Sequence, residues 1–175
     1  YREVCVGDAH SSVATALLDR VTETKQSELA VFFEHNANRK YDYIISPDAG
    51  ASKKTAEFCS KMKADVEMVQ CLKVRDPATG NITKTTVLHE DFVEEDCLIV
   101  DDICDGGRTF IELAKEIKKQ TNLPIYLIVT HGIFSAGFVQ LGEYFDGIFC
   151  TNSGYNINEP ISYKDTKKAK QWDRV

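Results

Sequence analysis

The stretch 97–110 constrains the fold of this chain more than any other part of its sequence. It opens with an apolar run, 97–100, which is too short for a helix and is typical of a buried strand. The adjacent carboxylates Asp101 and Asp102 follow, and then a tight loop that contains Gly106 and Gly107. Beyond that loop, apolar residues recur at helical spacing. The stretch therefore predicts a strand, a glycine loop and a helix in direct succession.

Such a succession forms an anion site, because free backbone N–H groups and the helix dipole point at whatever lies before the helix. The loop suits a phosphate monoester, and the carboxylates beside it suit vicinal hydroxyls or a hydrated metal ion. A phosphorylated sugar carries both features. The plainer alternative is a βα turn whose carboxylates merely cap a helix. The acid pair, the loop length and Thr109 together favour the sugar phosphate.

The rest of the chain alternates between strand and helix patterns, which predicts an α/β fold with a parallel sheet and helices on both faces. Two of the strands form a flexible β-hairpin around the turn 77–81. The predicted strands are 4–6, 41–45, 66–74, 82–88, 97–100, 124–130 and 147–151. The first predicted helix begins after Ser11 or Ser12 as N-cap and carries Val13, Ala16, Leu17 and Val21. The other predicted helices are 27–33, 53–62, 110–119 and 134–145. In the helix 53–62 we expect Ala56 and Cys59 to face inward. From Asn156 onward we expect a solvated terminus.

Composition narrows the function classes. The chain has 175 residues, which fits one domain, and a formal net charge of −6. An acidic chain lacks the basic face that a nucleic-acid partner needs, and no apolar run is long enough to span a membrane. The six cysteines form no Cys-x-x-Cys pair, so neither a zinc site nor a disulfide framework is indicated. We therefore expect a reduced, cytoplasmic protein with no nucleic-acid or membrane partner.

Two further segments carry candidate site residues. The turn 46–54 contains Asp48, Ala49 and Gly50, and its small residues let backbone amides approach an anion, with Lys53 and Lys54 adding positive charge. Taken alone, it is also compatible with any tight βα turn. Lys73 and Arg75 stand beside the hairpin turn, where cations can stabilise the charge of a transferring phosphoryl group. Taken alone, they are better explained by an exposed basic hairpin, which is common on protein surfaces.

Several of these segments resemble one protein family. The stretch 97–110 resembles the sugar-phosphate loop of type I phosphoribosyltransferases. The segment Ser-Pro-Asp-Ala-Gly at 46–50 resembles the pyrophosphate loop of ribose-phosphate diphosphokinases. The segment 7–11 is similar to the Asp-x-His segment of that family, and Lys73-Val74-Arg75 to its Lys-x-Arg loop. Segments 130–135 and 150–152 resemble its later strand ends. The match runs in one order from Gly7 to Asn152, which makes it specific.

The resemblance implies a type I phosphoribosyltransferase-like fold and transfer of diphosphate from ATP to ribose 5-phosphate, with Mg²⁺ as cofactor. Lys73 and Arg75 would be catalytic, and Asp48, Ala49 and Gly50 would bind the diphosphate and nucleotide. The metal side would be served by His10 and Asp48. The ribose 5-phosphate would be held by Arg75, Asp101, Asp102, Asp105, Gly106, Gly107, Arg108 and Thr109.

The chain also departs from the family pattern. Arg108 stands where the family usually has Gly or Ala, and it either clamps the 5′-phosphate or crowds the loop. The match begins near the middle of the family's polypeptide. We therefore expect residues 1–175 to be a single phosphoribosyltransferase-like domain from the C-terminal part of a longer protein, inactive or slow alone and homo-oligomeric when intact. Two alternatives remain, namely a phosphoribosyltransferase that consumes phosphoribosyl diphosphate, and a non-catalytic regulatory relative that binds the sugar phosphate.

Overall fold

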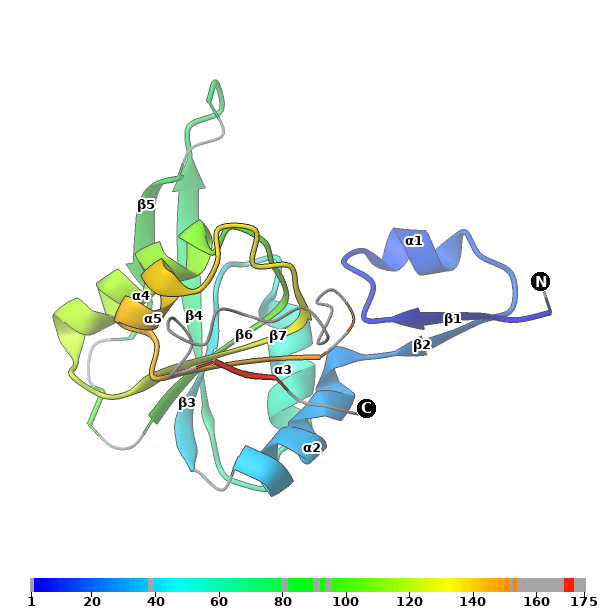
Figure 1. Cartoon of the computed structure of the whole chain (residues 1–175), viewed down its shortest axis with the longest axis horizontal. Helices are drawn as coiled ribbons and strands as arrows, with labels where there is room; N and C mark the ends of the chain where they lie inside the picture. Colours follow the sequence, from blue (N-terminus) through cyan, green and yellow to red (C-terminus); the bar gives the residue numbers. More distant parts are fainter. Residues whose placement is uncertain are drawn as a thin grey trace.

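A central sheet of seven strands forms the body of the molecule (Figure 1). A computed structural model describes residues 2–37, 40–79, 82–89, 92–93, 96–151, 153 and 169–171. Neighbouring strands of the sheet are parallel except for the antiparallel pair β4 and β5. In spatial order the strands are β5 (Ile82–Val87), β4 (Glu67–Arg75), β3 (Tyr41–Ser46), β6 (Asp96–Cys104), β7 (Ile125–Gly132), β8 (Gly147–Cys150) and β9 (Ala169–Gln171).

Helices cover both faces of this sheet, which confirms the predicted α/β class. On one face lie α4 (Arg108–Gln120) and α5 (Val139–Tyr144), and on the other lie α2 (Gln26–Ala37) and α3 (Ser52–Lys61). No helix in the described part of the chain is long and apolar enough to cross a membrane. Each face has its own apolar core, centred on Leu113 and Ile117 on the first face and on Phe33 and Phe58 on the second.

Strand β6 runs through the middle of both cores. Cys97 and Ile99 pack in the core under α4, whereas Leu98 and Val100 pack in the core under α2 and α3, and all are 0% exposed. Successive side chains of a strand point to opposite faces of a sheet. The carboxyl end of this strand therefore presents its next two residues to different sides of the molecule.

The N-terminal residues 2–25 form an arm that projects from the body (Figure 1). The arm contains β1 (Val4–Gly7), the short helix α1 (Ser12–Ala16) and β2 (Val21–Thr24), with β1 and β2 paired in parallel. The expectation that Val21 belongs to the first helix is wrong. Arg20 adopts a left-handed φ of 54°, which turns the chain out of helical geometry before β2.

Two predictions about helices also need correction. The helix expected at 134–145 covers only Val139–Tyr144, because Phe134 (φ 50°) and Gly137 (φ 72°) are left-handed and cannot continue a right-handed helix. On α3 the buried side chains are Thr55 and Phe58. The half-buried Cys59 packs against the same core, which confirms its predicted inward position, whereas Ala56 is exposed and was predicted wrongly.

The hairpin and the C-terminal segment agree with the sequence only in part. Strands β4 and β5 form the predicted antiparallel pair, and Gly80 and Asn81 of its turn lie outside the described residues. Residues 156–168 and 172–175 of the predicted solvated terminus lie outside them too. The backbone of β9 pairs in parallel with β8, so this segment adds an edge strand where the sequence suggested only a tail.

Candidate functional site

The glycine loop between β6 and α4 is shaped by Gly107. Its φ of 77° is left-handed, and a Cβ atom there would lie 3.0 Å from the Leu141 side chain, so only glycine fits without strain. The Gly107 carbonyl accepts the first backbone hydrogen bonds of α4, from Phe110 and Ile111, at 3.0 Å each. The first turn of α4 contains no acidic residue. The start of this helix is thus open to an anion.

A cavity of about 310 Å³ lies at this helix start, and we call it the glycine-loop cavity. It brings together side chains from the loop after β3, from β4, from the end of β6 and from the start of α4. It is lined by Asp48, Lys73, Asp101, Ile103, Asp105, Gly106, Gly107, Arg108, Thr109 and Phe110. Most of the residues predicted from the sequence therefore converge on one place.

Asp101 is the acidic group of this cavity that most lacks a balancing charge. Burial, and then the neighbouring charge of Asp102, raise the pKa of its carboxyl to about 7. A buried carboxyl in this state is relieved by a bound cation or by hydroxyl groups that donate hydrogen bonds to it. The cavity thus has an acceptor next to a helix start that favours anions.

Asp48 and Lys73 join the loop after β3 to the hairpin. The Lys73 Nζ atom lies 2.9 Å from Asp48 Oδ2, and the Lys73 side chain is only 5% exposed. Burial alone would raise the pKa of Asp48, but the hydrogen bond and charge of Lys73, with the amides of Ala51 and Gly50, hold that pKa below its ordinary value. The pair places one cation and one anion directly at the cavity.

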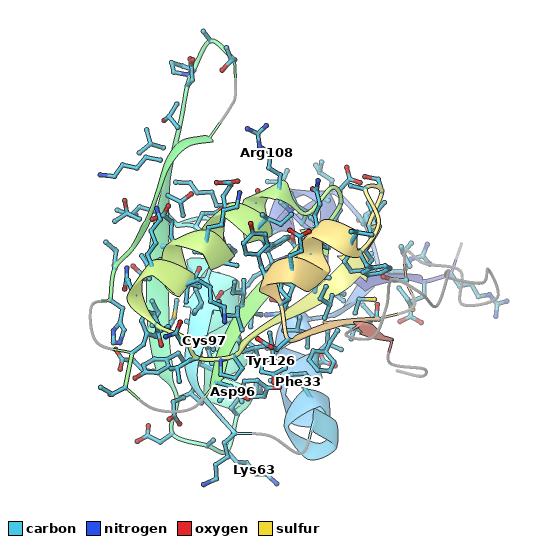
Figure 2. The ribbon with its side chains drawn as sticks, turned by 60° about the vertical axis from the view of Figure 1, so that its left-hand side comes forward. Phe33, Lys63, Asp96, Cys97, Arg108 and Tyr126 are labelled. Atoms are coloured by element: carbon cyan, nitrogen blue, oxygen red, sulfur yellow. The ribbon has the colours of Figure 1, made fainter. Side chains whose placement is uncertain are left out.

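The structure describes the side chain of only one of the two arginines of the predicted site. Arg108 is exposed and extends into solvent from the start of α4 (Figure 2), so it leaves the glycine loop uncrowded. The backbone of Arg75 pairs with Ile82 at the end of β4. The side chain of Arg75 lies outside the described part of the structure.

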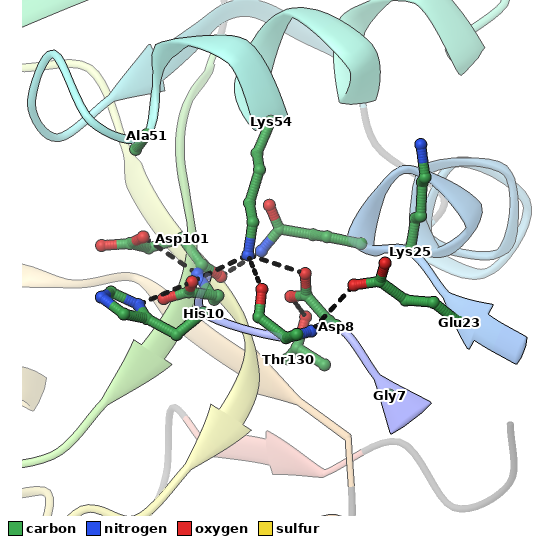
Figure 3. Close-up of polar contacts among 12 residues, drawn as sticks. Gly7, Asp8, His10, Glu23, Lys25, Ala51, Lys54, Asp101 and Thr130 are labelled. Carbon is green, nitrogen blue, oxygen red and sulfur yellow. Dashed lines mark hydrogen bonds and ion pairs between the residues drawn. The ribbon is translucent and has the colours of Figure 1, made fainter. Parts of the chain in front are cut away.

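Asp102 faces the opposite side of the sheet from Asp101. Its Oδ2 atom accepts hydrogen bonds from Lys54 Nζ at 2.8 Å and from His10 Nδ1 at 2.9 Å (Figure 3). The alternation along β6 explains this arrangement, because Asp102 follows Leu98 and Val100 onto the side of α3. The structure therefore does not bring the two carboxylates into one cavity.

A second cavity, of about 330 Å³, lies between the arm and helices α2 and α3, and we call it the arm cavity. His10 and Gly50 line this cavity, whereas Asp48 lines the glycine-loop cavity. Its lining is Asp8, Ala9, His10, Ser11, Ser12, Glu23, Lys25, Gln26, Ser27, Gly50, Lys53, Lys54 and Glu57. The two residues predicted to serve a metal thus lie in adjacent cavities.

The described residues contain no group of three His, Cys, Asp or Glu side chains arranged to hold a metal ion. Asp48 and Asp101 nevertheless line the same cavity and offer carboxylate oxygens, the ligands that Mg²⁺ prefers. Magnesium is commonly held by one or two carboxylates together with substrate phosphates. The donor set fits such an ion if it arrives with a phosphorylated ligand.

Several contacts of the site had no signal in the sequence, although Thr130 and His131 lie in the segment 130–135 that resembles the family. Gln26 is buried and donates from Nε2 to the Asp101 carbonyl. Thr130 donates to the Asp8 carboxylate, and His131 Nε2 lies 3.1 Å from the carbonyl oxygens of Gly7 and Asp8. The Gln26 contact joins residues 75 positions apart and the contacts of Thr130 and His131 join residues 122 to 124 positions apart, which no local pattern can reveal. Lys54 was noticed, but as a cation for an anion, and it contacts carboxylates instead.

Comparisons with known proteins identify the family and the fold of this chain. A family model described as the phosphoribosyl transferase domain matches residues 17–131. Ribose-phosphate pyrophosphokinase 3 of Saccharomyces cerevisiae is 27% identical over 150 residues, which cover 83% of this chain and 46% of that protein. The ribose-phosphate pyrophosphokinase of Mycoplasmopsis pulmonis is 32% identical over 126 residues, covering 71% of this chain and 39% of that protein.

Solved structures show the same fold. The phosphoribosylpyrophosphate synthetase from Mycobacterium smegmatis superposes with a TM-score of 0.76 at 18% identity, covering 98% of this chain and 54% of that chain. An adenine phosphoribosyltransferase from Thermoanaerobacter pseudethanolicus gives a TM-score of 0.52 at 22% identity, covering 70% of this chain and 77% of that chain. The chain spans less than half the length of the two curated relatives.

Proposed function

This chain belongs to the phosphoribosyl transferase domain family, and from that premise we propose that it is the catalytic domain of a ribose-phosphate diphosphokinase. The reaction is transfer of the β,γ-diphosphoryl group of ATP to the 1-hydroxyl of ribose 5-phosphate. The hydroxyl oxygen attacks the β-phosphorus, the bond to the oxygen of the α-phosphate breaks, and the hydroxyl proton is released. The products are AMP and phosphoribosyl diphosphate.

The observation that carries this proposal is the composition of the glycine-loop cavity. A helix start that favours a phosphate, a buried carboxyl that favours hydroxyls or a cation, and a lysine all line one space. The curated relatives quoted above, both named ribose-phosphate pyrophosphokinases, support diphosphate transfer. The structural likeness to an adenine phosphoribosyltransferase concerns the fold alone.

In this proposal the 5′-phosphate binds to backbone N–H groups at the start of α4, between Asp105 and Thr109, with Arg108 adding charge from outside the loop. Asp101 accepts hydrogen bonds from the ribose hydroxyls. Lys73, together with Arg75, stabilises the negative charge that spreads over the transferring group. Asp102 acts on the other side of β6, where it orients His10.

The nucleotide side uses the loop after β3 and the arm. The turn at Asp48, Ala49 and Gly50 approaches the diphosphate, and His10 faces the nucleotide phosphates or their water. Mg²⁺, when bound, neutralises charge on the diphosphate oxygens. Asp48 and Asp101 are the residues that would hold it, and they suit an ion that keeps several waters.

The reaction is tested by mixing the natural full-length protein with ATP, ribose 5-phosphate and Mg²⁺ and measuring AMP by chromatography. AMP should form only when all are present, and phosphorus NMR should show phosphoribosyl diphosphate. Residues 1–175 alone should be much slower, because catalysis needs both substrates positioned and the chain spans less than half of its curated relatives. Diphosphate release from phosphoribosyl diphosphate and a purine base, without AMP formation, would assign the chain to the base-using transferases instead.

Sugar binding is tested separately by calorimetry with ribose 5-phosphate. Binding should be lost in Asp101→Ala and Thr109→Ala, since both side chains line the glycine-loop cavity. The matched control is Lys119→Ala on the last turn of the same helix, whose side chain is 68% exposed and bonds only locally to Glu116. Affinity retained in both cavity variants would place the sugar elsewhere.

A further inference from the structure

Lys54 stands where a cation is unexpected. It lies in the first turn of α3, where the helix dipole disfavours positive charge. Its Nζ atom donates to Asp8 Oδ1 at 3.0 Å, to the Ala9 carbonyl at 2.8 Å and to Asp102 Oδ2 at 2.8 Å. An ammonium group has three N–H donors, so all of them are used within the protein. Burial alone would lower the pKa of Lys54, but the hydrogen bonds of Asp102 and Asp8 raise it, and the group stays charged.

Its partners come from distant parts of the chain, as Figure 3 shows. Asp8 and Ala9 directly follow β1 of the arm, whereas Asp102 lies near the carboxyl end of β6 in the body. Asp8 is 3% exposed although most of the arm is solvent-exposed, and its φ of 41° is left-handed. A non-glycine residue holds that conformation only when its surroundings fix it. Lys54 is one of the groups that fix it.

The contact between Asp102 and His10 shows what this arrangement achieves. An ionised carboxylate only accepts hydrogen bonds, so the proton between Asp102 Oδ2 and His10 Nδ1 lies on the nitrogen. In the neutral ring Nε2 is then the acceptor, available to a donor or a cation. The side chain of His10 is 83% exposed and would otherwise rotate freely. Its orientation depends on Asp102 and on the backbone at Ala9, and both are bonded to Lys54.

We propose that Lys54 is a positioning residue, which holds the end of the arm against Asp102 and thereby sets the orientation and tautomer of His10. This inference rests on the proposed function only for its effect on catalysis. Without the ammonium group, the carboxylates of Asp8 and Asp102 face each other uncompensated across the space that it occupied, and they repel. The segment Asp8–His10 of the arm then moves away from β6, and the His10 side chain loses its contact with Asp102.

The main test compares Lys54→Met with Lys54→Arg and with Lys61→Met, a control in the exposed last turn of the same helix. Two-bond proton–nitrogen NMR of the imidazole should show His10 protonated at Nδ1 in the wild type, in Lys54→Arg and in Lys61→Met. In Lys54→Met the signal should move to the Nε2-protonated pattern of an unconstrained ring. Hydrogen exchange at residues 4–10 should accelerate in the same variant only. An unchanged His10 pattern in folded Lys54→Met overturns the proposal.

Activity supplies the second measurement. If the wild type forms AMP, Lys54→Met should lose kcat/KM for ATP by on the order of 100-fold, as expected for a misplaced group, while ribose 5-phosphate affinity stays within threefold. A uniform loss of both affinities would indicate general damage and contradict the proposal. If the wild type forms no AMP, the proposed reaction fails, and the NMR comparison still decides the role of Lys54.

Folding of Lys54→Met is checked by its melting curve, and Asp8→Asn is the substitute if it does not fold. Asp8→Asn keeps the bond between Lys54 and Asp102 but removes the charged link from α3 to the arm. The His10 signal should shift in the same direction as in Lys54→Met. A folded Asp8→Asn protein with the wild-type His10 signal would equally overturn the proposal.

Discussion

The two sides of β6 show how neighbouring residues of one motif come to do different work. Asp101 faces a cavity in which burial keeps its pKa near 7 and a ligand can still relieve its charge. Asp102, the next residue, is 4% exposed and accepts from Lys54 and His10. The Asp101 carboxyl is accessible from a cavity, whereas the Asp102 carboxylate has its hydrogen-bond partners within the protein. The pleat of the strand thus divides an acidic pair into one carboxyl group that faces a cavity and one that is hydrogen-bonded within the protein.

The largest effect is expected on the open side, at Lys73. If Lys73 acts mainly on charge that develops in the transition state, Lys73→Ala should lower kcat and kcat/KM together and leave the KM for ribose 5-phosphate nearly unchanged. The loss should be on the order of 3–4 kcal/mol, or roughly 100- to 1000-fold in rate. Steady-state kinetics of the full-length protein measure it.

The control for this variant is Lys84→Ala, an exposed lysine on the other strand of the same hairpin. It should keep wild-type kinetics. A Lys73→Ala protein that keeps its kcat would show that the hairpin has no catalytic role. The two sides of β6 would then not differ in their importance for catalysis. That result would also favour the non-catalytic alternative.

Asp101 itself should make the stability of the fold depend on pH. Its folded pKa of about 7 lies above the ordinary value of 3.8, so the folded state holds this proton more tightly than the unfolded state. Stability from this group is present below pH 4 and is lost as pH rises to 7, by about 1.4 kcal/mol per unit within that window. The free energy of unfolding should therefore fall by about 2 kcal/mol less between pH 5 and 7 in Asp101→Asn than in the wild type.

Thermal melts of wild type and Asp101→Asn at several pH values give this difference, which corresponds to about 4–8 °C in Tm for a chain of this size. Asp102→Asn is the comparison on the closed side, since it removes the negative charge that Lys54 and His10 contact and should destabilise the fold at neutral pH. Equal pH profiles for the two variants would mean that the two carboxylates share one environment.

The smallest effect is expected where β7 supports the arm. Thr130 is buried and donates its hydroxyl to Asp8, so Thr130→Val keeps the shape and removes one hydrogen bond to a charged group. The free energy of unfolding should fall by about 1.5 kcal/mol, as measured by urea denaturation. Thr85→Val on β5, away from the arm, should change it by less than about 0.5 kcal/mol. A larger loss for the control would show that the arm has no special dependence on Asp8.

Local patterns were enough to predict most of the body of this fold. The apolar run of β6, the glycine loop and the helical spacing of α4 lie in sequence order, and the structure shows each at its expected place. The convergence of the cavity residues could be predicted as well, because the carboxyl ends of parallel strands lie at one edge of a sheet. The roles of the individual site residues stay predictions.

The predictions that were wrong or missing concern contacts between distant segments or single backbone angles. Nothing around Arg20 or Phe134 announces a left-handed φ. Arg20 lies between the end of α1 and β2, and Phe134 lies where the expected helix should have begun, before α5. The direction of Lys54 could not be predicted, because the carboxylates that receive it are 46 and 48 residues away. The separation of Asp101 from Asp102 was available from strand alternation, but the resemblance treated the pair as a unit.

The ion pair between Lys73 and Asp48 has a consequence for the populations of the free protein. Each partner has a proposed role toward the nucleotide or the transferring group, and their bond at 2.9 Å occupies one N–H donor of Lys73 and the Oδ2 atom of Asp48. Under the proposed function, a nucleotide that needs these atoms binds productively to molecules in which the pair has opened. The apparent affinity for ATP is then the intrinsic affinity reduced by the open fraction. In the proposed reaction, the strength of this one contact therefore helps to set the nucleotide concentration that the protein needs.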